Sequence, residues 1–135
     1  MTTPVVRLPD GFRRQIIDHC LGESPNEGCG LFAMDGDEVV FVYPTPNGDT
    51  SPTRYTVPPG EHLKALTHAE SNGWRLGGVF HSHPTGFGAP SATDIAMALD
   101  PDWIYLVVGL IGETELRGWR IRTEKAEELR VVSVR

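Results

Sequence analysis

Apolar side chains recur at helical spacing near the start of the chain. Phe12, Ile16 and Cys20 lie four residues apart, which places them on one face of an amphipathic helix. The spacing predicts a helix over residues 10–21, with Asp10 as its N-cap and a glycine just after its end.

The next apolar positions follow β-rich runs. Gly30–Met34 and Glu38–Tyr43 flank Asp35-Gly36-Asp37, a combination that predicts a β-hairpin. Residues 44–52 are rich in Pro, Asn, Gly and Ser and predict a loop. A short strand is expected at Arg54–Val57.

Helical and extended patterns then alternate. We expect a helix at Glu61–Ser71, with Leu63 and Leu66 facing inward, and a strand at Leu76–His81. A further helix is predicted at Ala92–Leu99, because a proline follows it.

The last third of the chain holds its most hydrophobic run. Trp103–Leu110 predicts a central strand, Glu115–Arg122 its hairpin partner and Val131–Val134 an edge strand. Strands and helices mix without a linker or repeat, so residues 1–135 predict a single domain of the α/β (α+β) class.

Length, charge and composition argue against several classes of protein. At 135 residues the chain is shorter than the about 200 that a TIM barrel needs. Twelve Lys and Arg against eighteen Asp and Glu give a net charge of −6, which argues against a nucleic-acid partner. Trp103–Leu110 is too short to span a bilayer, so no membrane partner is expected. Cys20 and Cys29 are expected to be free thiols in a cytoplasmic protein.

The candidate chemistry lies between the last two predicted helices. His81 and His83 are two residues apart on an extended segment, so both imidazoles project to the same side. Ser91 and Asp94 have the spacing of a capping box, which would hold the Asp94 carboxylate at a helix start. Two His and one carboxylate make the three protein ligands of a catalytic zinc site.

Spacing alone leaves the simpler interpretation open, in which Ser91 and Asp94 only cap a helix. Hydrolysis at such a site also needs a general base. Glu27 is a candidate, but its position alone does not rank it above Glu23 or Glu70.

The combined pattern resembles a known family. Glu27-x-Cys29-Gly30, followed by His81-x-His83-x7-Ser91-x2-Asp94, resembles the JAMM motif of the MPN (Mov34/PAD-1) metalloproteases. The motif spans about half of the chain. Ser51–Tyr55 and Gly60–Lys64 further resemble the small stand-alone bacterial members, some of which process ubiquitin-fold sulfur-carrier proteins.

The resemblance implies a fold and a role for each residue. The fold would be an MPN-like mixed, curved sheet flanked by helices. His81, His83 and Asp94 would bind Zn²⁺, Glu27 would be the acid/base that holds the attacking water, and Ser91 would stabilise the oxyanion or orient the water. Cys29 would be a packing residue.

The resemblance also implies a substrate. The enzyme would hydrolyse an amide bond at the C-terminal tail of a ubiquitin-fold carrier protein, with zinc-bound water as the nucleophile. The loop Pro84–Pro90 would border the groove for that tail, and its glycines predict a mobile rim on which Phe87 touches the tail or packs as an ordinary loop aromatic. Two alternatives stay open: a non-catalytic MPN scaffold, and a role like that of the RadC branch, whose loop also has a His-x-His-Pro-x-Gly pattern.

Overall fold

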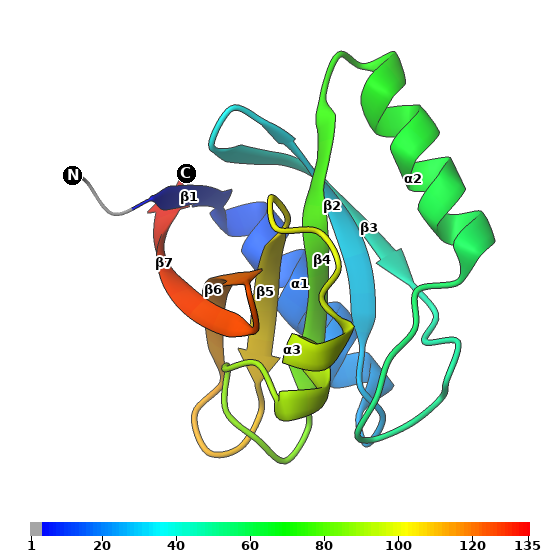
Figure 1. The fold of residues 1–135 in the computed structure, drawn as a ribbon, viewed down its shortest axis with the longest axis vertical. Helices are drawn as coiled ribbons and strands as arrows, with labels where there is room; N and C mark the ends of the chain where they lie inside the picture. Colours follow the sequence, from blue (N-terminus) through cyan, green and yellow to red (C-terminus); the bar gives the residue numbers. More distant parts are fainter. Residues whose placement is uncertain (1–3) are drawn as a thin grey trace.

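Strands of mixed direction close into a barrel. Within residues 4–135, the part of the chain that the computed structural model describes, the barrel order is β1-β3-β2-β4-β5-β6-β7 (Figure 1). The strands are β1 (Val5–Pro9), β2 (Cys29–Asp35), β3 (Glu38–Thr45), β4 (Arg75–His83), β5 (Ile104–Gly109), β6 (Glu115–Arg122) and β7 (Lys125–Val134). The helices are α1 (Asp10–Glu23), α2 (Pro59–Ser71) and α3 (Ala92–Met97). The expected mixed, curved sheet flanked by helices is therefore confirmed.

The centre of the sheet carries the residues of the motif. Strand β2 pairs antiparallel with both β3 and β4, and β4 pairs parallel with β5. All six residues of β5 are buried, so its predicted central position is confirmed. The register sets Cys29 opposite His81, which brings the segment before β2 alongside the end of β4.

Both ends of the chain depart from the sequence prediction. Val5–Pro9 forms strand β1. The hydrophobic pattern did not predict this strand, because the run is short and lies between Pro4 and Pro9. The expected edge strand is the longer β7, which pairs with β6 on one side and with β1 on the other. Closure of the barrel thus removes the edge at β7.

Three local predictions were wrong. Asp10 is the first helical residue and Pro9 is the N-cap, without a side-chain cap. Arg54–Val57 is a loop, because the segment pairs with no strand of residues 4–135. Its Tyr55 and Val57 side chains pack against the apolar cluster outside the barrel. Leu63 is 64% exposed, because α2 buries its alanines instead.

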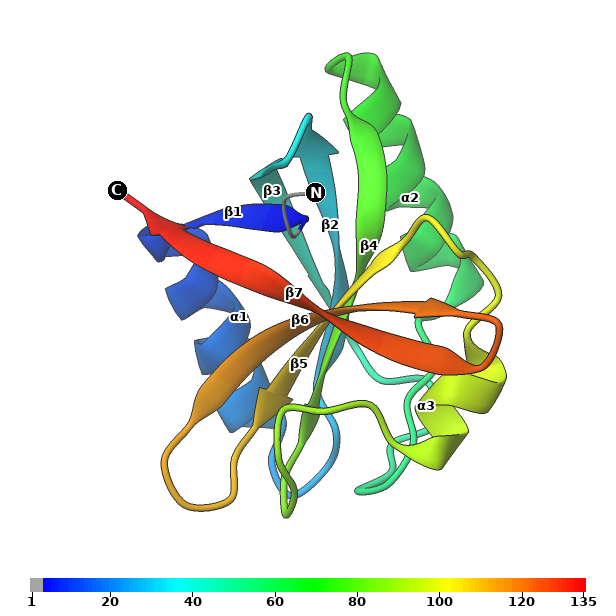
Figure 2. The same ribbon diagram turned by 60° about the vertical axis from the view of Figure 1, so that its left-hand side comes forward.

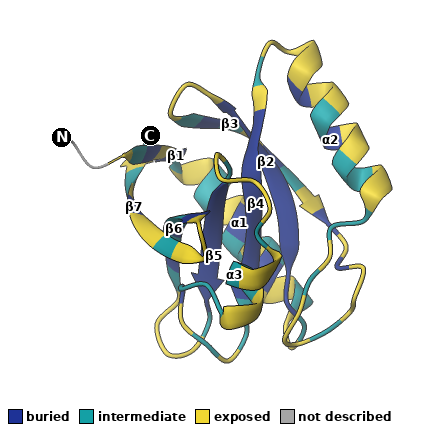
Figure 3. Ribbon diagram, viewed as in Figure 1, coloured by how far each residue is buried: buried dark blue, intermediate teal, exposed yellow. Residues whose placement is uncertain are grey.

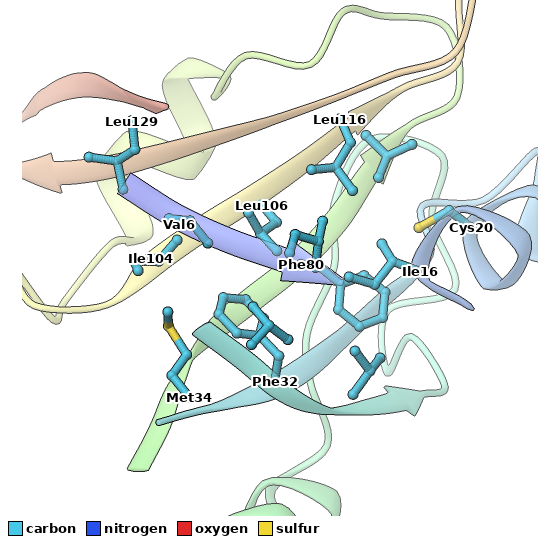
Figure 4. Close-up of a cluster of buried hydrophobic side chains, with 14 residues drawn as sticks. Val6, Ile16, Cys20, Phe32, Met34, Phe80, Ile104, Leu106, Leu116 and Leu129 are labelled. Carbon is cyan, nitrogen blue, oxygen red and sulfur yellow. The ribbon is translucent and has the colours of Figure 1, made fainter. Parts of the chain in front are cut away.

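Two apolar clusters lie on opposite sides of the sheet. Figure 2 shows α1 on one side of the strands and α2 on the other. Ile16 and Cys20 of α1 pack with Phe32, Phe80 and Leu106 inside the barrel (Figure 4). The second cluster lies beneath α2 and α3 and includes Leu31, Val79 and Tyr105. Figure 3 shows the result, with buried strands at the centre and exposed outer faces on the helices.

Among the helices of residues 4–135, none combines the length and apolarity needed to cross a membrane.

Candidate active site

Two imidazoles and one carboxylate converge at the end of β4. The Nε2 atoms of His81 and His83 lie 3.2 Å apart. Asp94 Oδ2 lies 2.9 Å from His81 Nε2 and 3.0 Å from His83 Nε2. The alternation of a strand puts both imidazoles on one face, and the first turn of α3 brings the carboxylate to them.

Glu27 lies beside the same two histidines. Its carboxylate and the ring nitrogens of His81 and His83 lie within 4.8 Å of one another. The Glu27 residue is only 4% exposed, and its Oε1 has no hydrogen-bond partner in the part of the chain that the structure describes. A buried carboxyl oxygen without a partner is costly in a folded protein, and such atoms are common where a ligand or water binds.

Ser82 connects the two halves of this arrangement. Its side chain points away from the imidazoles of its neighbours, and its Oγ accepts a 2.8 Å hydrogen bond from the Gly28 N–H. The Ser82 N–H donates to the Gly28 carbonyl at 3.0 Å. These bonds hold the backbone next to Glu27 against β4. Ser82 was not among the residues expected to have a role, although strand alternation puts its side chain on the face opposite to those of His81 and His83.

Ser91 begins α3 as predicted. Its Oγ accepts a hydrogen bond from the Asp94 N–H at 3.0 Å, and its own N–H donates to Asp94 Oδ2 at 2.8 Å, which completes a capping box. The hydroxyl oxygen acts as an acceptor in this box. Its proton therefore stays available for a second hydrogen bond, so capping does not prevent a further role.

The loop after β4 is tied to the barrel. The Phe87 carbonyl lies 2.9 Å from His83 Nδ1. The Gly88 N–H donates to Glu115 Oε2 at 2.7 Å, and the Gly88 carbonyl accepts from Trp119 Nε1 at 2.8 Å. These hydrogen bonds attach Phe87 and Gly88 to the barrel, whereas the mobile rim that the glycines of Pro84–Pro90 indicate stays a prediction. Phe87 itself projects outward and is 67% exposed.

A cleft leads away from Asp94 along the barrel surface. Its volume is about 720 Å³. One wall is the loop that carries Arg54 and Tyr55, and the other is α3 with the residues after it. The apolar lining includes Tyr55, Val57, Val79, Met97, Leu99, Trp103 and Tyr105. Met97 and Leu99 are 72% and 91% exposed. The residues that line this cleft do not include the loop Pro84–Pro90, which the family resemblance implied would border the substrate groove.

Tyr55 joins the cleft to the histidines. Its ring stacks on the imidazole of His81, with centroids 4.4 Å apart and an interplanar angle of 20°. The ring thus covers one face of a fully buried imidazole. From the sequence, Tyr55 was part of the family resemblance only, since its stacking on His81 joins two distant segments.

The electrostatics separate the roles of the acidic groups. Burial raises the pKa of Glu27 to about 7. The negative charge of Asp94 also raises this pKa, whereas the positive charge of His83 lowers it. Burial also acts to raise the pKa of Asp94, but hydrogen bonds from both histidines outweigh it and hold the pKa well below its usual range. The Asp94 carboxyl is therefore ionised at neutral pH, whereas the pKa of the Glu27 carboxyl lies close to neutral.

The two histidines also differ. Complete burial lowers the pKa of His81, despite its hydrogen bond with Asp94. Burial acts in the same direction on His83, but hydrogen bonds with Asp94 and the Phe87 carbonyl outweigh it and raise the pKa.

Both cysteines are free thiols in the buried interior, as expected. Burial raises the pKa of Cys20 to about 12 and that of Cys29 to about 11. Neither thiol is ionised at neutral pH, which agrees with a packing role for Cys29.

Known proteins are similar in sequence to this chain. Residues 9–122 match the family described as prokaryotic homologs of the JAB domain. A probable TtuB-protein conjugate cleaving protease of Thermus thermophilus is 42% identical over 70% of this chain and 64% of that protein. A desampylase of Haloferax volcanii is 32% identical over 99% of this chain and 98% of its own length. A CysO-cysteine peptidase of Mycobacterium tuberculosis is 32% identical over 78% of this chain and 75% of its own length.

Solved structures share the fold. A protein from Desulfitobacterium hafniense superimposes with a TM-score of 0.87 at 32% identity, over 96% of this chain and 92% of that one. A structure reported for a JAMM metalloprotease-like zinc site gives a TM-score of 0.64 at 16% identity, over 97% of this chain and 99% of that one. The chain therefore belongs to the prokaryotic branch of the JAB domain family, the JAMM/MPN metallopeptidases, and is an enzyme of that family.

Proposed function

We propose that the chain is a zinc-dependent peptidase or isopeptidase that hydrolyses an amide bond at the C-terminus of a small ubiquitin-fold carrier protein. The proposal rests on the convergence of His81, His83 and Asp94 beside Glu27, whose buried Oε1 has no hydrogen-bond partner among residues 4–135. Residues 1–135 would act as one catalytic domain.

The donor set fits a zinc ion. The three donor atoms of His81, His83 and Asp94 are separated by 2.9–3.2 Å. Tetrahedral zinc with bonds of about 2.0–2.1 Å places neighbouring ligand atoms about 3.3 Å apart, so small shifts would accommodate the ion. Two imidazole nitrogens and a carboxylate oxygen are common zinc ligands, and three protein ligands leave a position for water. A zinc ion held by these residues would lower the pKa of a bound water to about 7 and would polarise the scissile carbonyl.

Glu27 would move the proton. Its carboxylate lies within 4.8 Å of both histidines, and its pKa, raised to about 7 by burial, suits a group that both accepts and returns a proton at neutral pH. It would take the proton of the attacking water and deliver it to the amine that leaves. The Ser91 hydroxyl, whose proton the capping box does not use, would donate to the developing oxyanion.

The cleft beside Asp94 is suited to bind an extended polypeptide, which favours such a chain as the substrate. Its walls are mostly apolar, and Met97 and Leu99 expose large side chains at its rim, as binding surfaces often do. Three relatives are named as a conjugate-cleaving protease, a desampylase and a CysO-cysteine peptidase. We infer that the tail of the carrier lies in this cleft and that its last residue reaches the histidines.

An intact-mass cleavage assay tests the proposal. The zinc-loaded protein receives a ubiquitin-fold carrier from the same host, with either a C-terminal cysteine adduct or an isopeptide bond to a lysine peptide. Loss of only the cysteine assigns a role in sulfur-carrier processing, and loss of the lysine peptide assigns a deconjugating isopeptidase. Glu27→Gln should slow cleavage by about 10²- to 10⁴-fold, because the proton carrier is lost.

Glu70→Gln is the matched control, because Glu70 is an exposed carboxylate on α2 and should leave the rate unchanged. Cleavage at the wild-type rate by Glu27→Gln would reject the assigned base. If the zinc-loaded wild type cleaves neither substrate, the proposed substrate is rejected.

A further inference from the structure

The side chain of Asn47, just after β3, uses all of its hydrogen-bonding capacity. Nδ2 donates to the Glu27 carbonyl at 3.1 Å and to the Arg54 carbonyl at 2.9 Å. Oδ1 accepts from the Asp49 N–H at 2.9 Å and from the Thr56 N–H at 3.1 Å. The residue is only 8% exposed. An amide offers two donors and two acceptor positions, so this buried amide is fully satisfied.

One side of this network holds the main chain of Glu27. Its carbonyl accepts from Asn47, and its N–H donates to the Ser51 carbonyl at 2.8 Å. Both backbone groups of Glu27 are therefore bonded to residues of the 46–58 loop. Within residues 4–135, the Oε1 atom of the Glu27 carboxyl is buried without a hydrogen-bond partner. The direction of that carboxyl depends on the backbone that carries it.

The other side of the network holds the wall of the cleft. Arg54 and Thr56, both bonded to Asn47, flank Tyr55. The Tyr55 ring stacks on His81 and lines the cleft beside Asp94. One amide thus fixes the position of the carboxyl and of the aromatic wall relative to each other.

We propose that Asn47 is a positioning residue that couples the proton-transfer group Glu27 to the substrate-binding wall formed by Tyr55. The inference rests on the proposed function for the roles of those two residues. A buried amide that served only stability would affect the free energy of unfolding. A positioning amide also changes catalysis in a protein that remains folded and metal-loaded.

Two substitutions at Asn47 remove different parts of the network. Asn47→Ala removes all four hydrogen bonds. Asn47→Asp keeps the acceptors for Asp49 and Thr56 and loses the donors to Glu27 and Arg54. Asn72→Ala, at the exposed end of α2, is the matched control. The measurements are kcat and KM on the cleaved carrier, zinc affinity by chelator competition, and hydrogen exchange of individual amides.

We expect Asn47→Ala to lower kcat by about 10- to 100-fold and to raise KM, with zinc affinity unchanged. The Glu27 and Thr56 amides should exchange faster, while the amides of β4 stay protected. Asn47→Asp should lower kcat with a smaller change in KM, because the Thr56 bond persists. Asn72→Ala should match the wild type in every measurement.

Wild-type kcat and KM in either folded Asn47 variant would overturn the proposal. The proposal would also be overturned if the lower kcat were fully explained by a loss of bound zinc, or by a rise in hydrogen exchange that is uniform over the protein. If Asn47→Ala does not fold, Asn47→Asp decides. If the wild type cleaves no carrier, the proposed function fails, and the exchange data still decide: unchanged exchange at Glu27 and Thr56 overturns the positioning role, and faster exchange supports it.

Discussion

Cys20 shows how one buried side chain supports the site from behind. It lies on α1 with no exposed surface, and its thiol neighbours the Ser82 hydroxyl. A methyl group on Gly28 would lie 2.8 Å from the Cα atom of Cys20, so α1 packs directly against the backbone next to Glu27. Glycine at position 28 is therefore required by the close approach of two backbones.

The buried thiol makes stability depend on pH. Because burial raises the pKa of Cys20 from 9.0 to about 12, the unfolded state releases this proton first as pH rises. The thiol's contribution is complete below pH 9 and is lost between pH 9 and 12, at up to about 1.4 kcal/mol per pH unit. Urea unfolding at pH 8 and pH 10 measures the loss. Cys20→Ala should lose less stability over this interval than the wild type, and an equal loss in both would contradict the assignment.

At the scale of elements, β6 stabilises a loop that it does not adjoin in sequence. Glu115 and Trp119 bind the two backbone groups of Gly88, and the preceding Phe87 carbonyl binds His83 Nδ1. A second hydrogen bond on the far nitrogen of a metal-binding histidine orients its ring. Strand β6 therefore helps to orient His83 at the proposed metal centre, because it holds the loop whose Phe87 carbonyl bonds His83.

Removing the anchor should weaken metal binding. We expect Glu115→Ala to lower zinc affinity by about 10-fold, because the Phe87 carbonyl no longer holds His83 in place. Glu115→Gln keeps an acceptor and should retain most of the affinity. Chelator competition measures both, with the exposed Glu113→Ala as control. Equal affinity in all three variants would show that the loop keeps its place without β6.

At the scale of the whole molecule, the proposed zinc ligands come from β4 and α3, and their neighbour Glu27 precedes β2. An ion that binds only this folded arrangement stabilises it by mass action. With free zinc at 100 times the dissociation constant, the gain is about 2.7 kcal/mol, which corresponds to a rise in Tm of roughly 10 °C. Thermal unfolding with zinc and with a chelator measures this rise, and His81→Ala should abolish it. A rise that persists in His81→Ala would place the ion elsewhere.

The net charge of −6 carries a second prediction at this scale. Binding to DNA requires positive groups that displace counterions, so we expect no binding even at low salt. A fluorescence-polarisation titration with duplex DNA checks this. Salt-dependent binding would instead support the role like that of the RadC branch.

Elements with strong periodicity and chemistry that depends on nearby residues could be predicted from the sequence alone. The spacing of Phe12, Ile16 and Cys20 predicted α1, and Ser91 with Asp94 predicted the capping box, because both depend on residues within a few turns of one another. The alternation of His81 and His83 predicted imidazoles on a common side for the same reason.

Features that depend on contacts between distant segments could not be predicted from local sequence. Barrel closure pairs β1 with β7, and the packing of α2 leaves Leu63 exposed while it buries two alanines. Glu27 could not be ranked above other acidic residues by its position, since its place beside the histidines comes from the register of β2 and β4. The bonds of Asn47 and the anchors of Gly88 likewise join residues from separate segments. Local pattern carries no signal for such contacts, because they form only when the barrel closes.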